Sequence, residues 1–244
     1  MKSIVLHESP SHQWIVYGRD EGKPEKLLDT NQYLIRTHEQ SLLLDPGGIE
    51  LFAPMLAAVL RDVPLQQITH LFSSHQDPDV ISSLGLWDEV LPQATLHAPW
   101  LWEGFIRHFG MNNISFDPIE DRGGRMQLGS VELEFIPAHF LHSPGNIHLY
   151  DASSGILFSG DIGAALEPVD VPLFVENFDE HISKMRFFHQ RWMPSNEAKN
   201  QWIRRVRKLK INMLCPQHGR IFRGNQVNQF LDWLESLEVG IAHG

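Results

Sequence analysis

Residues 74–80 read Ser74-His75-Gln76-Asp77-Pro78-Asp79-Val80 and place three side chains that can bind metal ions at every second position. The preceding residues, 68–72, have the apolar character of a β-strand. A strand that ends here delivers His75, Asp77 and Asp79 into one loop at the edge of a sheet, where rigid strands hold such loops in position. The stretch therefore predicts a metal site at the end of a strand.

Three later segments repeat this arrangement, because each puts a His or an Asp shortly after an apolar run. They are Phe140-Leu141-His142-Ser143-Pro144-Gly145-Asn146, Leu157-Phe158-Ser159-Gly160-Asp161 and Cys215-Pro216-Gln217-His218-Gly219. The four segments together offer three imidazoles and three carboxylates: His75, His142, His218, Asp77, Asp79 and Asp161. Each alone could be an ordinary polar residue of a turn or a helix cap. Their joint occurrence after strand-like runs favours a centre for two metal ions.

The composition restricts the class of protein. With 244 residues and 42% hydrophobic side chains, the chain is long enough for one large layered domain, and we expect residues 1–244 to form it. The net charge of -10 argues against nucleic acid or an anionic membrane as partner. Residues 1–8 turn polar too early for a signal peptide, and no apolar run reaches membrane-spanning length. A cytoplasmic protein is expected.

The single cysteine, Cys215, excludes an internal disulfide and a cysteine-ligated iron–sulfur cluster or zinc knuckle within one chain. It precedes His218 on a strand that reads as buried, and we interpret it as a core residue. His139 lies three residues before His142 and is either a structural residue or a hydrogen-bond partner behind the ligands. We expect no catalytic residues beyond the metal site.

Periodicity predicts an α/β protein. Strands are expected at residues 14–17, 33–36, 41–44, 68–73, 95–97, 131–136, 147–150, 156–158 and 211–214. Helices are expected at residues 50–61, 80–90, 100–109, 178–192 and 196–208, with a final helix capped by Asn225. The order is strands then helices, twice over. This predicts two similar halves packed as one sandwich, with loops meeting along one edge.

The chemistry of the candidate ligands narrows the metal. Carboxylate and imidazole together suit iron or manganese, and imidazole also suits zinc, so ligand type leaves zinc and manganese open. Three carboxylates carry a charge of -3. Two divalent ions would leave a small positive excess, and two trivalent ions a larger one that an added oxygen bridge offsets. Such a site is suited to a change of oxidation state while a small anion or dioxygen is captured.

These motifs resemble the metallo-β-lactamase fold over residues 30–235, which implies a four-layer αββα sandwich. Hydrolases of that fold carry His-x-His-x-Asp-His, whereas this chain has Asp77 in place of the second His and Val80 in place of the last. The pattern instead resembles the di-iron branch: the flavodiiron proteins and, more closely, the oxygen-binding di-iron proteins linked to chemotaxis. Residues 171–176 and 191–196 also resemble the latter group.

The resemblance implies a set of ligand roles. His75, Asp77 and His142 would bind one iron ion, Asp79 and His218 would bind the other, and Asp161 would bridge the two. Each ion would keep an open position, which binding of dioxygen requires.

The resemblance also implies a function. Flavodiiron proteins carry a flavodoxin domain, and nothing after His218 is long enough for one, so we expect no bound flavin. We predict a di-iron protein that binds dioxygen, or reduces it slowly, and reports it to a signalling or redox partner. The alternatives are a metallohydrolase of a small ester, thioester, lactone or phosphodiester, and an oxygen or nitric oxide reductase fed by an external flavoprotein. A homo-oligomer is compatible with each of these functions.

Overall fold

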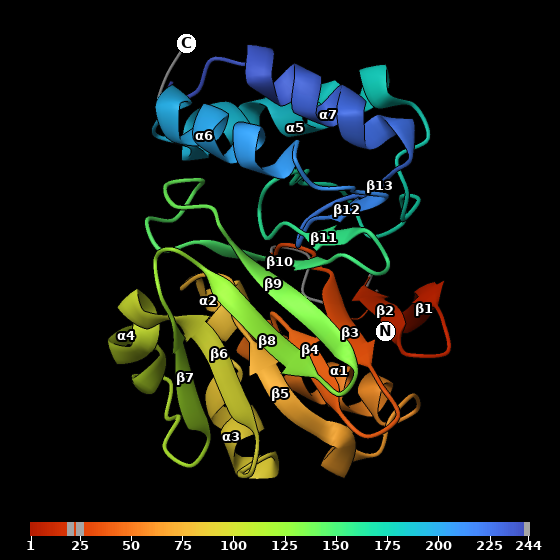
Figure 1. Cartoon of the computed structure of the whole chain (residues 1–244), viewed down its shortest axis with the longest axis vertical. Helices are drawn as coiled ribbons and strands as arrows, with labels where there is room; N and C mark the ends of the chain where they lie inside the picture. Colours follow the sequence, from red (N-terminus) through yellow and green to blue (C-terminus); the bar gives the residue numbers. More distant parts are fainter. Residues whose placement is uncertain (19–21, 23–26, 242–244) are drawn as a thin grey trace.

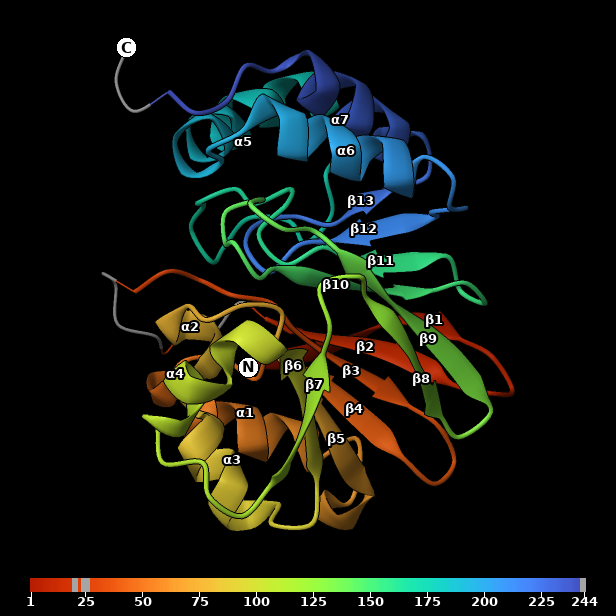
Figure 2. The same cartoon turned by 60° about the vertical axis from the view of Figure 1, so that its left-hand side comes forward.

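Two β-sheets pack face to face, and helices cover both outer faces (Figures 1 and 2). The structure is a computed structural model that describes residues 1–18, 22 and 27–241. The predicted four-layer αββα sandwich is confirmed by this arrangement. Within the described residues, the helices lack the length and apolar character needed to cross a membrane.

The first sheet has seven strands in sequence order. They are β1 (Lys2–Glu8), β2 (Gln13–Gly18), β3 (Gln32–Arg36), β4 (Ser41–Leu44), β5 (Ile68–Phe72), β6 (Thr95–Pro99) and β7 (Ser115–Ile119). Strands β1 to β4 pair antiparallel, and β4 to β7 pair parallel. Because β4 and β5 run in the same direction, the loops that follow them emerge at the same edge of the sheet.

The second sheet has six strands in the order β13-β12-β11-β10-β9-β8. They are β8 (Gly124–Leu128), β9 (Val131–Pro137), β10 (Ile147–Asp151), β11 (Ile156–Phe158), β12 (Met213–Cys215) and β13 (Phe222–Arg223). Strand β9 pairs antiparallel with β10, β10 pairs antiparallel with β11, and β11 pairs parallel with β12. The loops after β9, β11 and β12 therefore open at one edge.

The helices form the two outer layers. One layer contains the 3-10 helices η1 (Ile49–Leu51), η2 (Leu65–Gln67) and η3 (Trp100–Trp102) and the α-helices α1 (Phe52–Val59), α2 (Pro78–Ile81), α3 (Leu84–Val90) and α4 (Glu103–Arg107). The other contains α5 (Phe178–Trp192), α6 (Asn196–Val206) and α7 (Asn225–Ser236). Each helix layer shares an apolar core with its sheet, and a third core fills the space between the sheets. Cys215 lies in this third core, as predicted.

The structure corrects several predicted element boundaries. The helix predicted at residues 80–90 is divided into α2 and α3, because Ser83 donates its hydroxyl to the carbonyl of Gly47 and Ser82 accepts from the amide of Ile49. The cap predicted at Asn225 is wrong: Gly224, with φ +58, precedes the helix, and no side chain caps it.

Four strands, β1, β7, β8 and β13, were not predicted. Strands β1 and β7 are the edges of the first sheet and expose most of their residues. They therefore lack the alternation of a half-buried strand.

Candidate metal centre

All six predicted side chains lie close together at one edge of the sandwich, which we call the metal-binding edge, where strands β5, β9, β11 and β12 end. His75, Asp77 and Asp79 come from the loop after β5 and the first turn of α2. His142 comes from the loop between β9 and β10, Asp161 from the loop after β11, and His218 from the loop after β12. Residues from both sheets thus meet at one edge of the sandwich, as carboxyl ends of strands do in α/β proteins.

Four of the side chains form one compact group. The ligand atoms of His75, Asp77, His142 and Asp161 all lie within 4.8 Å of one another. The Nε2 atom of His142 is 2.6 Å from Oδ2 of Asp77, and Nε2 of His75 is 3.6 Å from the same oxygen. The rings of His75 and His142 meet edge to face, with centroids 5.3 Å apart. Two imidazoles and two carboxylates thus converge on one point.

The remaining two side chains form a second group beside the first. The Nε2 atom of His218 lies 3.2 Å from Oδ2 of Asp79 and 3.5 Å from Oδ1 of Asp161. The other oxygen of Asp161, Oδ2, lies 3.5 Å from Nε2 of His142 and 3.8 Å from Nε2 of His75. The two oxygens of Asp161 therefore face two different groups of ligand atoms.

The loop that carries His142 has an unusual backbone. His142 has a φ of +77 and Phe140 a φ of +61, a region that side chains other than glycine rarely adopt. Hydrogen bonds hold the loop: the hydroxyl of Ser143 donates to Oε1 of Gln76 at 2.6 Å, and the side-chain Nδ2 of Asn146 donates to the carbonyl of Leu141 at 2.9 Å. These contacts maintain a conformation that turns His142 toward Asp77.

Two of the imidazoles are oriented from behind by hydrogen bonds. The backbone amide and the hydroxyl of Ser74 donate to the carboxylate of Asp45, so this hydroxyl accepts from Nδ1 of His75 at 2.8 Å. The Nδ1 atom of His218 donates to the carbonyl of Asp29 at 2.9 Å. Both bonds fix the tautomer that leaves Nε2 free to bind a metal ion, as is usual for histidine ligands.

The electrostatics favour protonated imidazoles at His75 and His218, and an ionised carboxylate at Asp77, when no metal ion is bound. Burial lowers the pKa of His75, but the carboxylates of Asp161 and Asp77 outweigh it and raise the pKa to about 9. Burial also lowers the pKa of His218, and Asp161 and Asp79 raise it to about 9. Burial raises the pKa of Asp77, but the hydrogen bond from His142 and the nearby His75 imidazole hold it well below its usual range. A bound cation would take the place of these protons.

The donor atoms fit a metal centre. The Nε2 atom of His75 and Oδ1 of Asp161 are buried, with no hydrogen-bond partner among the described residues. Buried polar atoms of this kind are costly unless a partner is supplied. The imidazoles of His75 and His218 are almost fully buried, whereas the side chains of Asp77 and Asp79 are 28% and 26% exposed, so the centre opens on the side of these two carboxylates. Nitrogen and carboxylate donors without thiolate suit iron, manganese or zinc.

Two neighbouring residues differ from the ligands. His139 lies between the carbonyl oxygens of Asp121 and Pro144, with its ring nitrogens 2.6 Å and 3.1 Å away, and so braces the loop that carries His142. Asp45, which orients His75 through Ser74, is not among the residues that the sequence predicts for the site. The sequence signal that could have identified Asp45 as a site residue is its position directly after the apolar run that forms β4, the neighbour of β5.

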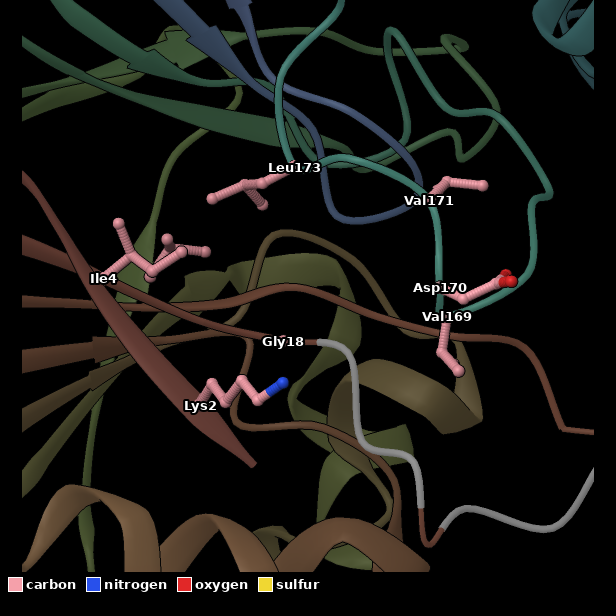
Figure 3. A pocket seen from close by; sticks show the side chains of 8 residues that line it. Lys2, Ile4, Gly18, Val169, Asp170, Val171 and Leu173 are labelled. Atoms are coloured by element: carbon pink, nitrogen blue, oxygen red, sulfur yellow. The ribbon is translucent and has the colours of Figure 1, made fainter.

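A separate hollow of about 380 Å³ lies between β1 and residues 169–173 (Figure 3). Among the described residues that line it, most are aliphatic, and Lys2 and Asp170 carry a charge. The described residues of this lining provide no set of metal ligands.

Known proteins resemble this chain over most of its length. The family model described as "ODP family beta lactamase" matches residues 28–219. A structure of the peroxy diiron species of the chemotaxis sensor ODP is 39% identical, with a TM-score of 0.88, and the match covers 100% of this chain and 98% of that one. The apo state of the chemotaxis sensor ODP from T. denticola is likewise 39% identical with a TM-score of 0.88, covering 99% and 97%.

Longer flavoproteins are more distant relatives. A putative diflavin flavoprotein of Synechocystis is 25% identical over 195 residues, which are 79% of this chain and 33% of that protein. The chain spans about half the length, or less, of the curated relatives that it matches. The family model covers most of the chain, and the solved structures match it from end to end. The chain therefore belongs to the ODP family of beta-lactamase proteins.

Proposed function

We propose that this chain is a di-iron protein that binds dioxygen, or reduces it slowly, and reports oxygen to a signalling partner. The observation that carries the proposal is Asp161, whose two carboxylate oxygens face two separate groups of ligand atoms. A carboxylate in this position suits a bridge between two ions. His75, Asp77 and His142 would hold one ion, and Asp79 and His218 the other.

The residues of the chain have defined tasks in this function. Two iron ions, when bound, supply open coordination positions and one-electron changes of charge. Asp45, through Ser74, and the carbonyl of Asp29 keep His75 and His218 in the tautomer that presents Nε2. The ring of Phe188 lies 6.0 Å from that of His142 and shields this side of the centre from water.

The choice of iron and dioxygen is supported by ligand chemistry and by kinship. Three carboxylates beside three imidazoles give a harder set of donors than the histidine-rich pattern of the zinc hydrolases. The relative that matches over its whole length is described as a chemotaxis sensor with a peroxy diiron species. Both observations favour the oxygen-binding reading over hydrolysis of an ester, thioester, lactone or phosphodiester.

Metal analysis and absorption spectroscopy test the proposal. Protein from cells supplied with both iron and zinc should contain about two metal ions per chain, mainly iron. The reduced, oxygen-free protein should be nearly colourless and gain a visible absorption band on exposure to oxygen. His142→Ala should lose most of this band, and His108→Ala, which changes an exposed histidine directly after α4, should retain it.

Two results would contradict the proposal. One is zinc in both positions of protein from iron-replete cells. The other is reduced, iron-loaded protein that shows no spectral change with oxygen but hydrolyses a substrate efficiently, with that hydrolysis lost in His142→Ala. The second result would establish the metallohydrolase alternative instead.

A further inference from the structure

The C-terminal half of α5 exposes large aromatic side chains. Phe187 is 68% exposed and Trp192 41% exposed. The exposed Lys184, Arg186 and Arg191 lie on the same stretch of helix, and we call these five residues the α5 face. Aromatic and arginine side chains are enriched in protein interfaces. The α5 face thus has the composition of a contact surface.

The charge of the α5 face is opposite to that of the whole chain. Lys184, Arg186 and Arg191 form no ion pair with any carboxylate in the part of the chain that the structure describes. The guanidinium of Arg191 lies 5.9 Å from the centre of the Trp192 ring. Yet the chain carries a net charge of -10. A local cluster of unpaired cations on an acidic protein attracts an acidic partner and orients it as it approaches.

Aromatic rings connect this face to the metal centre. The ring of Trp192 stacks on that of Phe188, with centroids 5.1 Å apart and planes 10° from parallel. These residues are four positions apart, so they are neighbours on the helix surface. Phe188 is only 5% exposed, and the centre of its ring also lies 6.0 Å from that of His142. Three rings therefore form a continuous path from solvent to a candidate metal ligand.

We propose that the α5 face docks an acidic one-electron carrier protein, and that electrons enter the metal centre through Trp192 and Phe188. This inference rests on the proposed di-iron function. In each transfer the carrier loses one electron and a ferric ion becomes ferrous, while no bond forms or breaks. Two transfers would return both ions to the ferrous state. The stacked rings place protein rather than solvent between carrier and centre.

The charges argue for this occupant over two others. An anionic membrane would face the negative charge of the rest of the chain. A second copy of this chain would bring the same three cations to the contact if the two faces met symmetrically. An acidic carrier has the opposite charge to the three cations, and its contact can be confined to the α5 face, whereas a membrane surface extends past that face to the acidic rest of the chain.

Binding to the metal-free protein tests the docking independently of iron. The probe is an oxidised flavodoxin, an acidic flavin-bearing carrier, added to the full chain and followed by calorimetry at low ionic strength. Lys184→Glu combined with Arg186→Glu should weaken binding about tenfold or more, because it creates repulsion between like charges. Lys210→Glu should have little effect, because Lys210 lies by the β10–β11 turn, away from the metal-binding edge. Salt should weaken binding to the wild type.

Anaerobic mixing of reduced flavodoxin with the ferric protein tests the path. At flavodoxin concentrations that saturate binding to each variant, Trp192→Leu should reduce the iron several-fold more slowly than the wild type, and Trp192→Phe, which retains a ring, should recover most of the rate. Circular dichroism checks that each variant folds.

Some outcomes overturn the inference. They are no binding to the metal-free protein, equal weakening by Lys210→Glu, self-association of the chain that the double variant abolishes, or a rate that Trp192→Leu leaves unchanged. If the protein takes up zinc and no iron, the proposed di-iron function fails, while the docking measurement still decides the use of the α5 face.

Discussion

His189 on α5 offers a quantitative test of how the fold supports the loop that carries Asp161. The Nδ1 atom of His189 donates to the carbonyl of Met185 at 2.9 Å, and Nε2 accepts from the amide of Gly163 at 3.0 Å. Gly163 follows Asp161 by two residues and has a φ of +97. Only the neutral ring can make both hydrogen bonds, because a proton on Nε2 would face the amide proton of Gly163.

The expected change in folding free energy with pH follows from the pKa of His189. Burial lowers the pKa of His189 from the ordinary 6.5 to about 4. At about 1.4 kcal/mol per pH unit, this corresponds to about 3 kcal/mol of folding free energy. The folded pKa is depressed, so the unfolded chain binds the proton more readily. The contribution is therefore fully present above pH 6.5 and is lost as the pH falls toward 4.

Urea unfolding of the metal-free protein between pH 4 and pH 8, followed by circular dichroism, measures this contribution. His189→Gln removes the titration but retains a group that can accept from Gly163. The wild type should be the more stable protein at pH 8, and its advantage should shrink by about 1.4 kcal/mol per pH unit below 6.5. His70, His148 and His181, whose pKa values burial also lowers, are present in both proteins and cancel. An advantage that stays constant across this range would refute the reasoning.

Four further substitutions have defined outcomes. Asp161→Ala should lose more metal than Asp79→Ala in elemental analysis, and equal losses would contradict the bridging role. Asp45→Ala removes the acceptor that orients His75, so metal affinity measured by competition with a chelator should fall about 10- to 100-fold; an unchanged affinity would remove Asp45 from the site. Ser195→Ala removes the cap that accepts from the amide of Ala198, and should cost about 1 kcal/mol in urea unfolding with no change in metal content.

The sequence allowed the fold and the membership of the candidate site to be predicted for one physical reason. Each ligand follows an apolar run, and apolar runs form the buried strands of the sandwich. The carboxyl ends of such strands meet at one edge, so side chains that are far apart in the chain, such as His75 and His218, come together. The pattern of apolar runs followed by His or Asp therefore predicts which distant residues meet at the candidate metal centre.

Other features depend on pairings that no local pattern reveals. Asp45 reaches Ser74 only because β4 and β5 lie side by side and parallel, and nothing around Asp45 distinguishes it from an ordinary turn residue. The edge strands β1 and β7 have one neighbour each and expose most of their residues, so they lack a periodic apolar signal. The division of the helix after α2 depends on contacts that Ser82 and Ser83 make with a distant loop.

Helix α5 lies between the exposed α5 face and the buried candidate metal centre, and different positions of its helical repeat face each of them. Its adjacent buried residues Phe188 and His189 contact different loops, because Phe188 packs on the ring of His142 and His189 binds the turn after Asp161. The opposite side of the same helix carries the exposed Phe187 and three unpaired cations. Helix α5 contacts two loops that carry candidate ligands and also faces solvent. It can therefore couple the α5 face to the candidate metal centre. The docking and unfolding experiments therefore examine two sides of one helix.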